Sequence, residues 1–153
     1  MIFNFHTGIL ACVMMMSTAQ ADDSVSHFPK KDLGRFLAEH FDLTSIRSSL
    51  GPRRSRGMHT TFADLGMQPS RISENFVVFE SPNAWLYEMK IVGRRDVNGD
   101  GIEDLVVCFL DRALNGGTYD SSQGLLVTRY SAGGYAIALS FSPGEGGCED
   151  YAR

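Results

Sequence analysis

The fold is decided by residues 85–110, which read WLYEMKIVGRRDVNGDGIEDLVVCFL. In the first part, 85–92, apolar and polar residues alternate, as they do in a β-strand with one buried face. The last part, 105–110, is apolar on both faces, which predicts a strand in the centre of a sheet. Between them, Asn98-Gly99 and Asp100-Gly101 are dipeptides typical of hairpin turns. The stretch therefore predicts an antiparallel hairpin.

Further strands extend this hairpin on both sides. Residues 76–79 form a short apolar run before it, and the runs 125–130 and 135–141 follow it. We expect residues 112–123, which are rich in Gly, Asn and Ser, to form a long connection. Five strands that follow one another along the chain predict an antiparallel β-meander.

A helix is predicted before the strands, because apolar residues there recur at a spacing of three and four. These residues are Leu33, Phe36, Leu37, Phe41, Leu43 and Ile46. Asp32 is the expected N-cap, and Gly51-Pro52 ends the helix at the latest. The small side chains of Ala136, Ala138 and Ser140 provide a surface on which the 33–50 helix can pack. The predicted class is α+β, an N-terminal helix packed on an antiparallel β-meander of about five strands.

The composition is that of a single soluble domain. The chain has 153 residues, of which 43% are hydrophobic and 21% are charged, and its net charge is −4. A modest negative charge argues against a nucleic-acid binder and against a polybasic membrane-surface protein.

The first 21 residues predict a signal peptide. They contain no Asp, Glu, Lys or Arg, they include the apolar run 8–16, and they end in Ala19-Gln20-Ala21. We expect cleavage after residue 21, then a polar leader at 22–31 and one domain at 32–153. The protein would be periplasmic or secreted, with no stable membrane insertion after cleavage. An uncleaved anchor, a buried segment and a lipoprotein formed through Cys12 are the alternatives.

Cleavage leaves two cysteines, Cys108 and Cys148. An even count in an oxidising compartment favours a disulfide, which would fix the C-terminal tail to the sheet. The alternative is a buried free thiol at Cys108 and a mobile Cys148.

The loop 96–104 carries the most specific chemical signal. Oxygen-bearing side chains stand at its first, third, fifth and ninth positions: Asp96, Asn98, Asp100 and Asp104. Gly101 permits the sharp turn that lets the carbonyl of Ile102 face inward. Such an all-oxygen set suits a hard cation, and its flexible size favours Ca²⁺. Water, Asp111 or Asp120 could complete the shell. In the competing interpretation, the loop is a hairpin turn without a metal.

Residues 96–107, DVNGDGIEDLVV, resemble the calcium loop and following strand of FG-GAP/VCBS-type repeats, the blades of integrin-like propellers. In those families the carboxylates hold calcium between two strands, and the loop supports extracellular binding surfaces. The chain has one such copy, whereas a propeller needs at least about four blades. The resemblance therefore implies the metal loop and not the propeller.

These observations predict an exported calcium-binding module, more a binder than an enzyme. Its metal would be structural, ordering the hairpin and the adjacent 112–123 connection. Loops near the site, with Tyr119 as the best exposed aromatic, would recognise a protein or glycan. The alternatives are a small exported hydrolase that uses the cation, and an inhibitor or envelope-assembly partner. Neither the partner nor the oligomeric state follows from the sequence.

Two weaker groups complete the candidates. Arg53, Arg54 and Arg56 could contact an anionic partner, but a solvated loop is the simpler interpretation. The histidines His27, His40 and His59 lack metal-ligand spacing, and we expect them to have no functional role.

Overall fold

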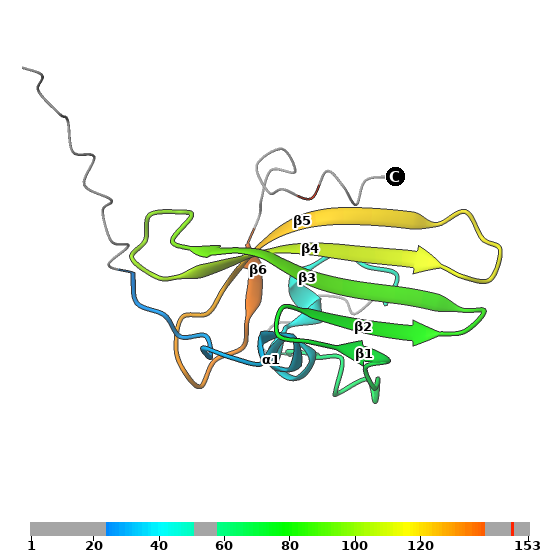
Figure 1. Cartoon of the computed structure of the whole chain (residues 1–153), viewed down its shortest axis with the longest axis horizontal. Helices are drawn as coiled ribbons and strands as arrows, with labels where there is room; N and C mark the ends of the chain where they lie inside the picture. Colours follow the sequence, from blue (N-terminus) through cyan, green and yellow to red (C-terminus); the bar gives the residue numbers. More distant parts are fainter. Residues whose placement is uncertain (1–23, 51–57, 140–147, 149–153) are drawn as a thin grey trace, which may run out of the picture.

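The computed structural model describes residues 24–50, 58–139 and 148. It has one α-helix, α1 (Leu33–His40), one 3₁₀ turn, η1 (Leu43–Ser45), and six strands. The strands are β1 (Arg71–Ile72), β2 (Phe76–Ser81), β3 (Trp85–Arg95), β4 (Asp104–Ala113), β5 (Asp120–Thr128) and β6 (Ile137–Leu139). They form one antiparallel sheet in chain order, with α1 on one face (Figure 1). The predicted helix on an antiparallel meander is confirmed, and β1 adds a sixth strand.

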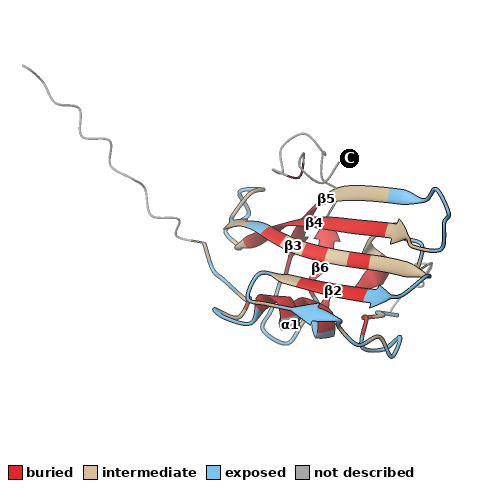
Figure 2. Ribbon diagram, turned by 45° about the vertical axis from the view of Figure 1, so that its right-hand side comes forward, coloured by how far each residue is buried: buried red, intermediate tan, exposed pale blue. Residues whose placement is uncertain are grey.

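The hairpin of β3 and β4 is the longest pairing in the sheet. Its register runs from Trp85 opposite Ala113 to Arg95 opposite Asp104, with a bulge between Ile91 and Gly93. Nearly all of β4 is buried, as Figure 2 shows for the centre of the sheet. This agrees with the apolar run on both of its faces, and it makes β4 the central strand.

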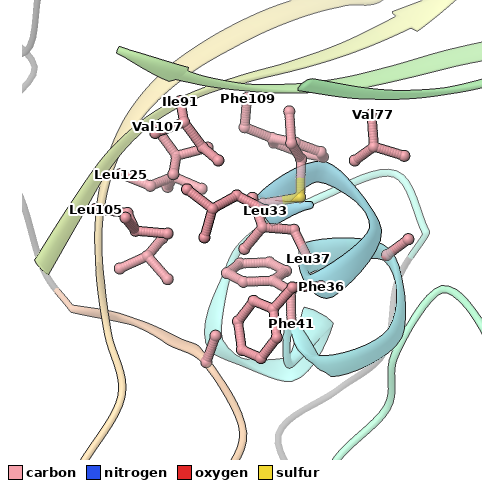
Figure 3. Close-up of a cluster of buried hydrophobic side chains, with 14 of the residues drawn as sticks. Leu33, Phe36, Leu37, Phe41, Val77, Ile91, Leu105, Val107, Phe109 and Leu125 are labelled. Carbon is pink, nitrogen blue, oxygen red and sulfur yellow. The ribbon is translucent and has the colours of Figure 1, made fainter. Parts of the chain in front are cut away.

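The main core lies between α1 and one face of the sheet (Figure 3). Helix residues Leu33, Phe36 and Leu37 meet side chains from four strands, which include Val77, Ile91, Leu105, Val107, Phe109 and Leu125. Phe28 also joins this core, with its ring edge-on to Phe36 at 5.8 Å between centroids. The inward-facing residues of β3 are the alternate ones predicted from the sequence.

The predicted helix is wrong in its second half. α1 ends at His40, and Phe41 has extended φ and ψ of −79° and 125°. Phe41 forms a parallel bridge with Ala136, in which the Asp42 amide donates to the Ala136 carbonyl at 2.8 Å. The Asp42 carboxylate then accepts from the Thr44 amide and starts η1. Phe41, in extended backbone, and Leu43, in η1, are both buried, so the apolar spacing does not distinguish this segment from a longer helix.

Two details of the helix environment also differ from expectation. Asp32 makes no side-chain cap and adopts φ 56°, while its amide donates to the Glu74 carboxylate. Ala136 and Ala138 are buried, and they lie against the C-terminal end of α1 and the segment that follows it, where the Ala136 amide donates to the His40 carbonyl at 2.9 Å. Ser140 lies outside the described residues. The Ala138 amide donates to the Ser45 hydroxyl at 2.9 Å.

The predicted long connection at 112–123 is also wrong. β4 continues to Ala113 and β5 begins at Asp120, so only residues 114–119 lie between the strands. Both strand ends are polar and partly exposed, and a polar strand end carries no alternating apolar signal.

The Cys108–Cys148 disulfide is present and links residues 40 positions apart. Both cysteines are buried. In the chain-entropy model, such a loop closure stabilises the fold by about 4 kcal/mol. A disulfide of this kind is typical of a protein from an oxidising compartment.

The approach of α1 to the sheet gives a stability prediction at Gly34. A Cβ there would lie 2.2 Å from the Phe76 carbonyl oxygen and 2.4 Å from that of Ser73. Both are backbone atoms, so Gly34→Ala must displace the helix and should lower the free energy of unfolding by about 1–3 kcal/mol. Urea unfolding measures this change.

Gly133→Ala is the matched control, because no atom lies within 4 Å of its added Cβ. Alanine restricts the unfolded chain, so this control should leave the protein as stable or raise its stability by up to about 1 kcal/mol. Equal effects of the two substitutions would contradict the packing described for α1.

Candidate metal centre

The loop 96–103 joins β3 to β4 at one end of the sheet and projects beyond the neighbouring strands (Figure 1). Its two ends are held together by the last pair of the ladder, Arg95 opposite Asp104. All five predicted donor residues therefore lie in this loop or at its base.

Asp96 organises the turn. Its Oδ1 accepts hydrogen bonds from the Gly99 amide at 2.7 Å and the Asp100 amide at 3.2 Å, and its Oδ2 accepts from the Gly101 amide at 2.8 Å. Gly99 and Gly101 have φ of 75° and 81°, a region that glycine enters without strain. The backbone thus curls around the first carboxylate of the loop.

Asn98 and Asp100 form the exposed tip. The Asn98 Oδ1 accepts from the Asp100 amide at 3.0 Å, and the Asp100 Oδ1 accepts from the Ile102 amide at 2.9 Å. The Asn98 side-chain amide also donates to the Asp100 Oδ2 at 3.0 Å. These are local side-chain-to-backbone bonds of the kind that shape turns.

Asp104 differs from the other donors because its side chain is completely buried, at 0% exposure. Its Oδ2 accepts from the Val97 amide at 3.1 Å, which directs the carboxylate toward the loop. Its Oδ1 is buried and has no hydrogen-bond partner among the described residues. Leaving a buried charged acceptor unsatisfied costs at least about 1–3 kcal/mol.

The N-terminal segment lies against this loop. The Val25 amide donates to the Gly101 carbonyl at 2.8 Å, and the Glu103 amide donates to the Val25 carbonyl at 3.0 Å. The Ile102 carbonyl takes part in neither bond of this bridge. The sequence did not predict the contact of Val25 with the loop. Hydrogen bonds between backbone groups require no particular side-chain pattern, so the polar leader at 22–31 gave no sign of them.

Glu103 is engaged on the outside of the loop. Its Oε1 accepts from the Arg94 guanidinium at 2.7 Å and from the Ser26 hydroxyl at 2.6 Å. Arg94 also donates to the Pro29 carbonyl at 3.2 Å. Glu103 therefore secures the N-terminal segment and does not face the donors of the loop.

Asp111 and Asp120 cannot complete a metal shell. Both lie near the opposite end of the hairpin, where Asp111 stands beside Tyr87 and Asp120 bonds Arg112. β3 has 11 residues, so about 30 Å separate the two ends. The 114–119 turn, with Tyr119, is therefore remote from the loop. The prediction that this connection lies next to the loop is wrong.

Asp111 instead secures another irregular segment to the sheet. It is buried and accepts hydrogen bonds from the Ser49 amide and hydroxyl, both at 2.6 Å. The Tyr119 hydroxyl donates to it at 3.3 Å. Partial burial raises the pKa of Tyr119, and the negative charge of Asp111 raises it further.

The described residues contain no group of three or more His, Cys, Asp or Glu side chains arranged around a common point as a metal would require. In the loop, the carboxylates of Asp96 and Asp100 are turned onto backbone amides instead. The loop is acidic and its backbone is already curled, but the side chains at its tip, Asn98 and Asp100, would have to rotate to bind a cation.

Two of the histidines named as weaker candidates make contacts within the fold. His40 stacks on Phe36, and the carbonyl of His27 accepts from Arg129. Arg53, Arg54 and Arg56 lie outside the described residues, as do the predicted signal peptide and Cys12.

His59 has a partner that the sequence did not indicate. Its Nδ1 lies 2.7 Å from the Oδ2 of buried Asp42. The two residues are 17 positions apart and no motif connects them. Burial alone would raise the pKa of Asp42, but the hydrogen bonds from His59, Thr44 and Thr60 outweigh it, so this pKa lies below the usual value.

A lowered carboxyl pKa has a defined consequence for stability. The contribution of Asp42 is present above about pH 4 and is lost as the pH falls through its folded-state pKa. Asp42→Asn should therefore lower stability at pH 7 and flatten the acid limb of the stability curve. Urea unfolding between pH 3 and pH 7 tests this, and an acid limb as steep as that of the parent would contradict it.

No protein-family model, curated protein or solved structure matches the chain. The resemblance of the loop to FG-GAP/VCBS repeats therefore stays a prediction from residues 96–107. In the part of the chain that the structure describes, no helix is long and apolar enough to cross a membrane.

Proposed function

We propose that this protein is an exported calcium-binding module whose metal lies in the loop 96–104. The observation that carries the proposal is the unpartnered Oδ1 of Asp104, a buried carboxylate oxygen at the base of an acidic loop. A bound cation would supply the missing partner. Burial of a charge is otherwise costly unless the charge is paired or coordinates a metal.

The donor set has the chemistry that a hard cation prefers, and rotation of the side chains at the tip would direct it toward a bound ion. It consists of oxygens from Asp96, Asn98, Asp100 and Asp104 and the backbone carbonyl of Ile102. Each carboxylate oxygen has two acceptor sites, and several of the loop bonds occupy only one of them. Water completes the shell, because Glu103 is bonded to Arg94 and Ser26. We expect an affinity on the order of 10⁻⁴ to 10⁻³ M, the class of extracellular calcium modules.

The role of the metal is structural. By fixing the backbone at Gly101 and Ile102, it would also fix Val25, which bonds the residues on either side of Ile102. Calcium would thus order both the hairpin end and the N-terminal segment. Recognition of a protein or glycan would involve this end of the sheet, including the turn after β5, where Tyr130 is 54% exposed.

Export is supported by the disulfide and by the signal-peptide pattern of residues 1–21. Disulfides persist in oxidising compartments, where free calcium is also compatible with weak sites. We therefore place the protein in the periplasm or outside the cell.

Thermal unfolding in chelator and in calcium up to about 100 mM, a hundredfold above the weakest expected Kd, tests this proposal, with magnesium as the control ion. Calcium at about a hundredfold excess over Kd should stabilise the protein by about 2.7 kcal/mol, and magnesium should do less. Asp104→Asn should abolish the calcium response, and so should Asp100→Ala. In chelator, Asp104→Asn should cost little stability, because it removes a buried unpaired charge.

Asp120→Asn is the matched control, since it removes a carboxylate at the opposite end of the hairpin. It should retain the full calcium response. If Asp104→Asn responded to calcium as the parent does, the ligand assignment would be wrong. A parent protein indifferent to calcium would refute the proposed function.

A further inference from the structure

A hollow of about 350 Å³ opens among three segments that are distant in the sequence. They are the C-terminal end of α1, the turn at 61–64 and the turn between β5 and β6. Its volume is at the lower end of that found for small-molecule sites. The metal loop contributes no residue to it, so it is a separate feature of the fold.

Two carboxylates give this hollow its charge. Glu39 lies on the last turn of α1, and Asp64 is fixed on the opposite segment by hydrogen bonds from the Thr61 amide and hydroxyl at 2.9 and 3.0 Å. Among the described residues that line it, none is Lys or Arg. Arg35 approaches Glu39 only at 3.9 Å and on the exposed helix surface, where such a pair is weak.

Tyr135 provides an aromatic wall, and the residue is 41% exposed. The ring of His59 stacks on it at 4.4 Å between centroids with an interplanar angle of 23°. His59 does not itself line the hollow, so it supports the tyrosine from outside.

The support continues into the protein interior. His59 is held through its Nδ1 by Asp42, which is only 4% exposed and also accepts from the Thr44 amide and hydroxyl. This chain of contacts fixes the orientation of Tyr135 before any ligand arrives. A preorganised wall loses little conformational freedom on binding.

We propose that this hollow binds a guanidinium or ammonium cation, carried either by a small amine or by an Arg or Lys side chain of a polypeptide. The aromatic ring attracts a cation through its quadrupole, and the two carboxylates pair with its N–H donors. The rest of the lining consists of His40, Thr61, Ala63, Gly133 and Gly134.

NMR titration of the purified protein tests this site with blocked arginine amide and, as the neutral isostere, blocked citrulline amide. Arginine amide should shift the resonances of residues that line the hollow, and citrulline amide should not. Comparison of agmatine with a blocked Gly-Arg-Gly peptide distinguishes the sources, since tighter binding of the peptide indicates a polypeptide ligand. Equal binding of arginine and citrulline amides would overturn the proposal.

Two variants probe the walls separately. Tyr135→Leu and Glu39→Gln should each weaken binding of arginine amide by roughly threefold to thirtyfold. Both residues are partly exposed, so neither change should unfold the protein, and Glu39→Gln is the milder of the two. Glu80→Gln, which neutralises an exposed carboxylate outside the hollow, should bind as the parent does. Unchanged binding in both Tyr135→Leu and Glu39→Gln would show that the cation binds elsewhere.

Discussion

The backbone pairing of β3 with β4 is the constraint on which the rest of the structure depends. It runs from Trp85 to Arg95 with one bulge between Ile91 and Gly93, and it fixes which residues of the two strands lie opposite one another. The acidic loop 96–104 is placed at one end, and the Asp111 cluster with Tyr119 at the other. Because a paired strand is nearly inextensible, no local adjustment can bring these two ends together. The sheet therefore supports separate sites, each with its own chemistry.

Buried charges attach the irregular segments to this sheet. Four Asp and Arg side chains are buried in the described part of the chain: Asp42, Asp104, Asp111 and Arg129. Three of them have several partners. Asp42 holds the chain at 59–60, Asp111 holds Ser49, and Arg129 donates to carbonyls of the β5–β6 turn and to that of His27. Asp104 is the exception, with one oxygen bonded and the other unpartnered. The fully bonded side chains stabilise the fold, whereas the carboxylate with a free oxygen is a candidate metal ligand.

Sequence patterns predicted the parts of the fold that depend on apolar burial. Alternation in 85–92 and the apolar run 105–110 correctly gave the central hairpin, and the spacing from Leu33 to Phe41 gave the buried face of α1. Helix length was missed, because Phe41 and Leu43 are buried equally well without a longer α-helix, one in extended backbone and the other in η1. Polar strand ends and the pairing of Val25 with the loop were missed as well, since hydrogen-bonded backbone leaves no trace in side-chain pattern. The Asp42–His59–Tyr135 contacts join three distant segments, which only the folded chain brings together.

The central claim is that calcium binds at the end of the hairpin where Asp104 lies. Amide resonances measured by NMR during a calcium titration test it most directly, because they report the position of binding as well as its strength. We expect the amide resonances of Gly99, Gly101 and Val25 to shift together with one Kd. The amide resonance of Gly116, in the turn at the opposite end, should keep its chemical shift. An absence of shifts in the loop, or equal shifts at both ends of the hairpin, would contradict it.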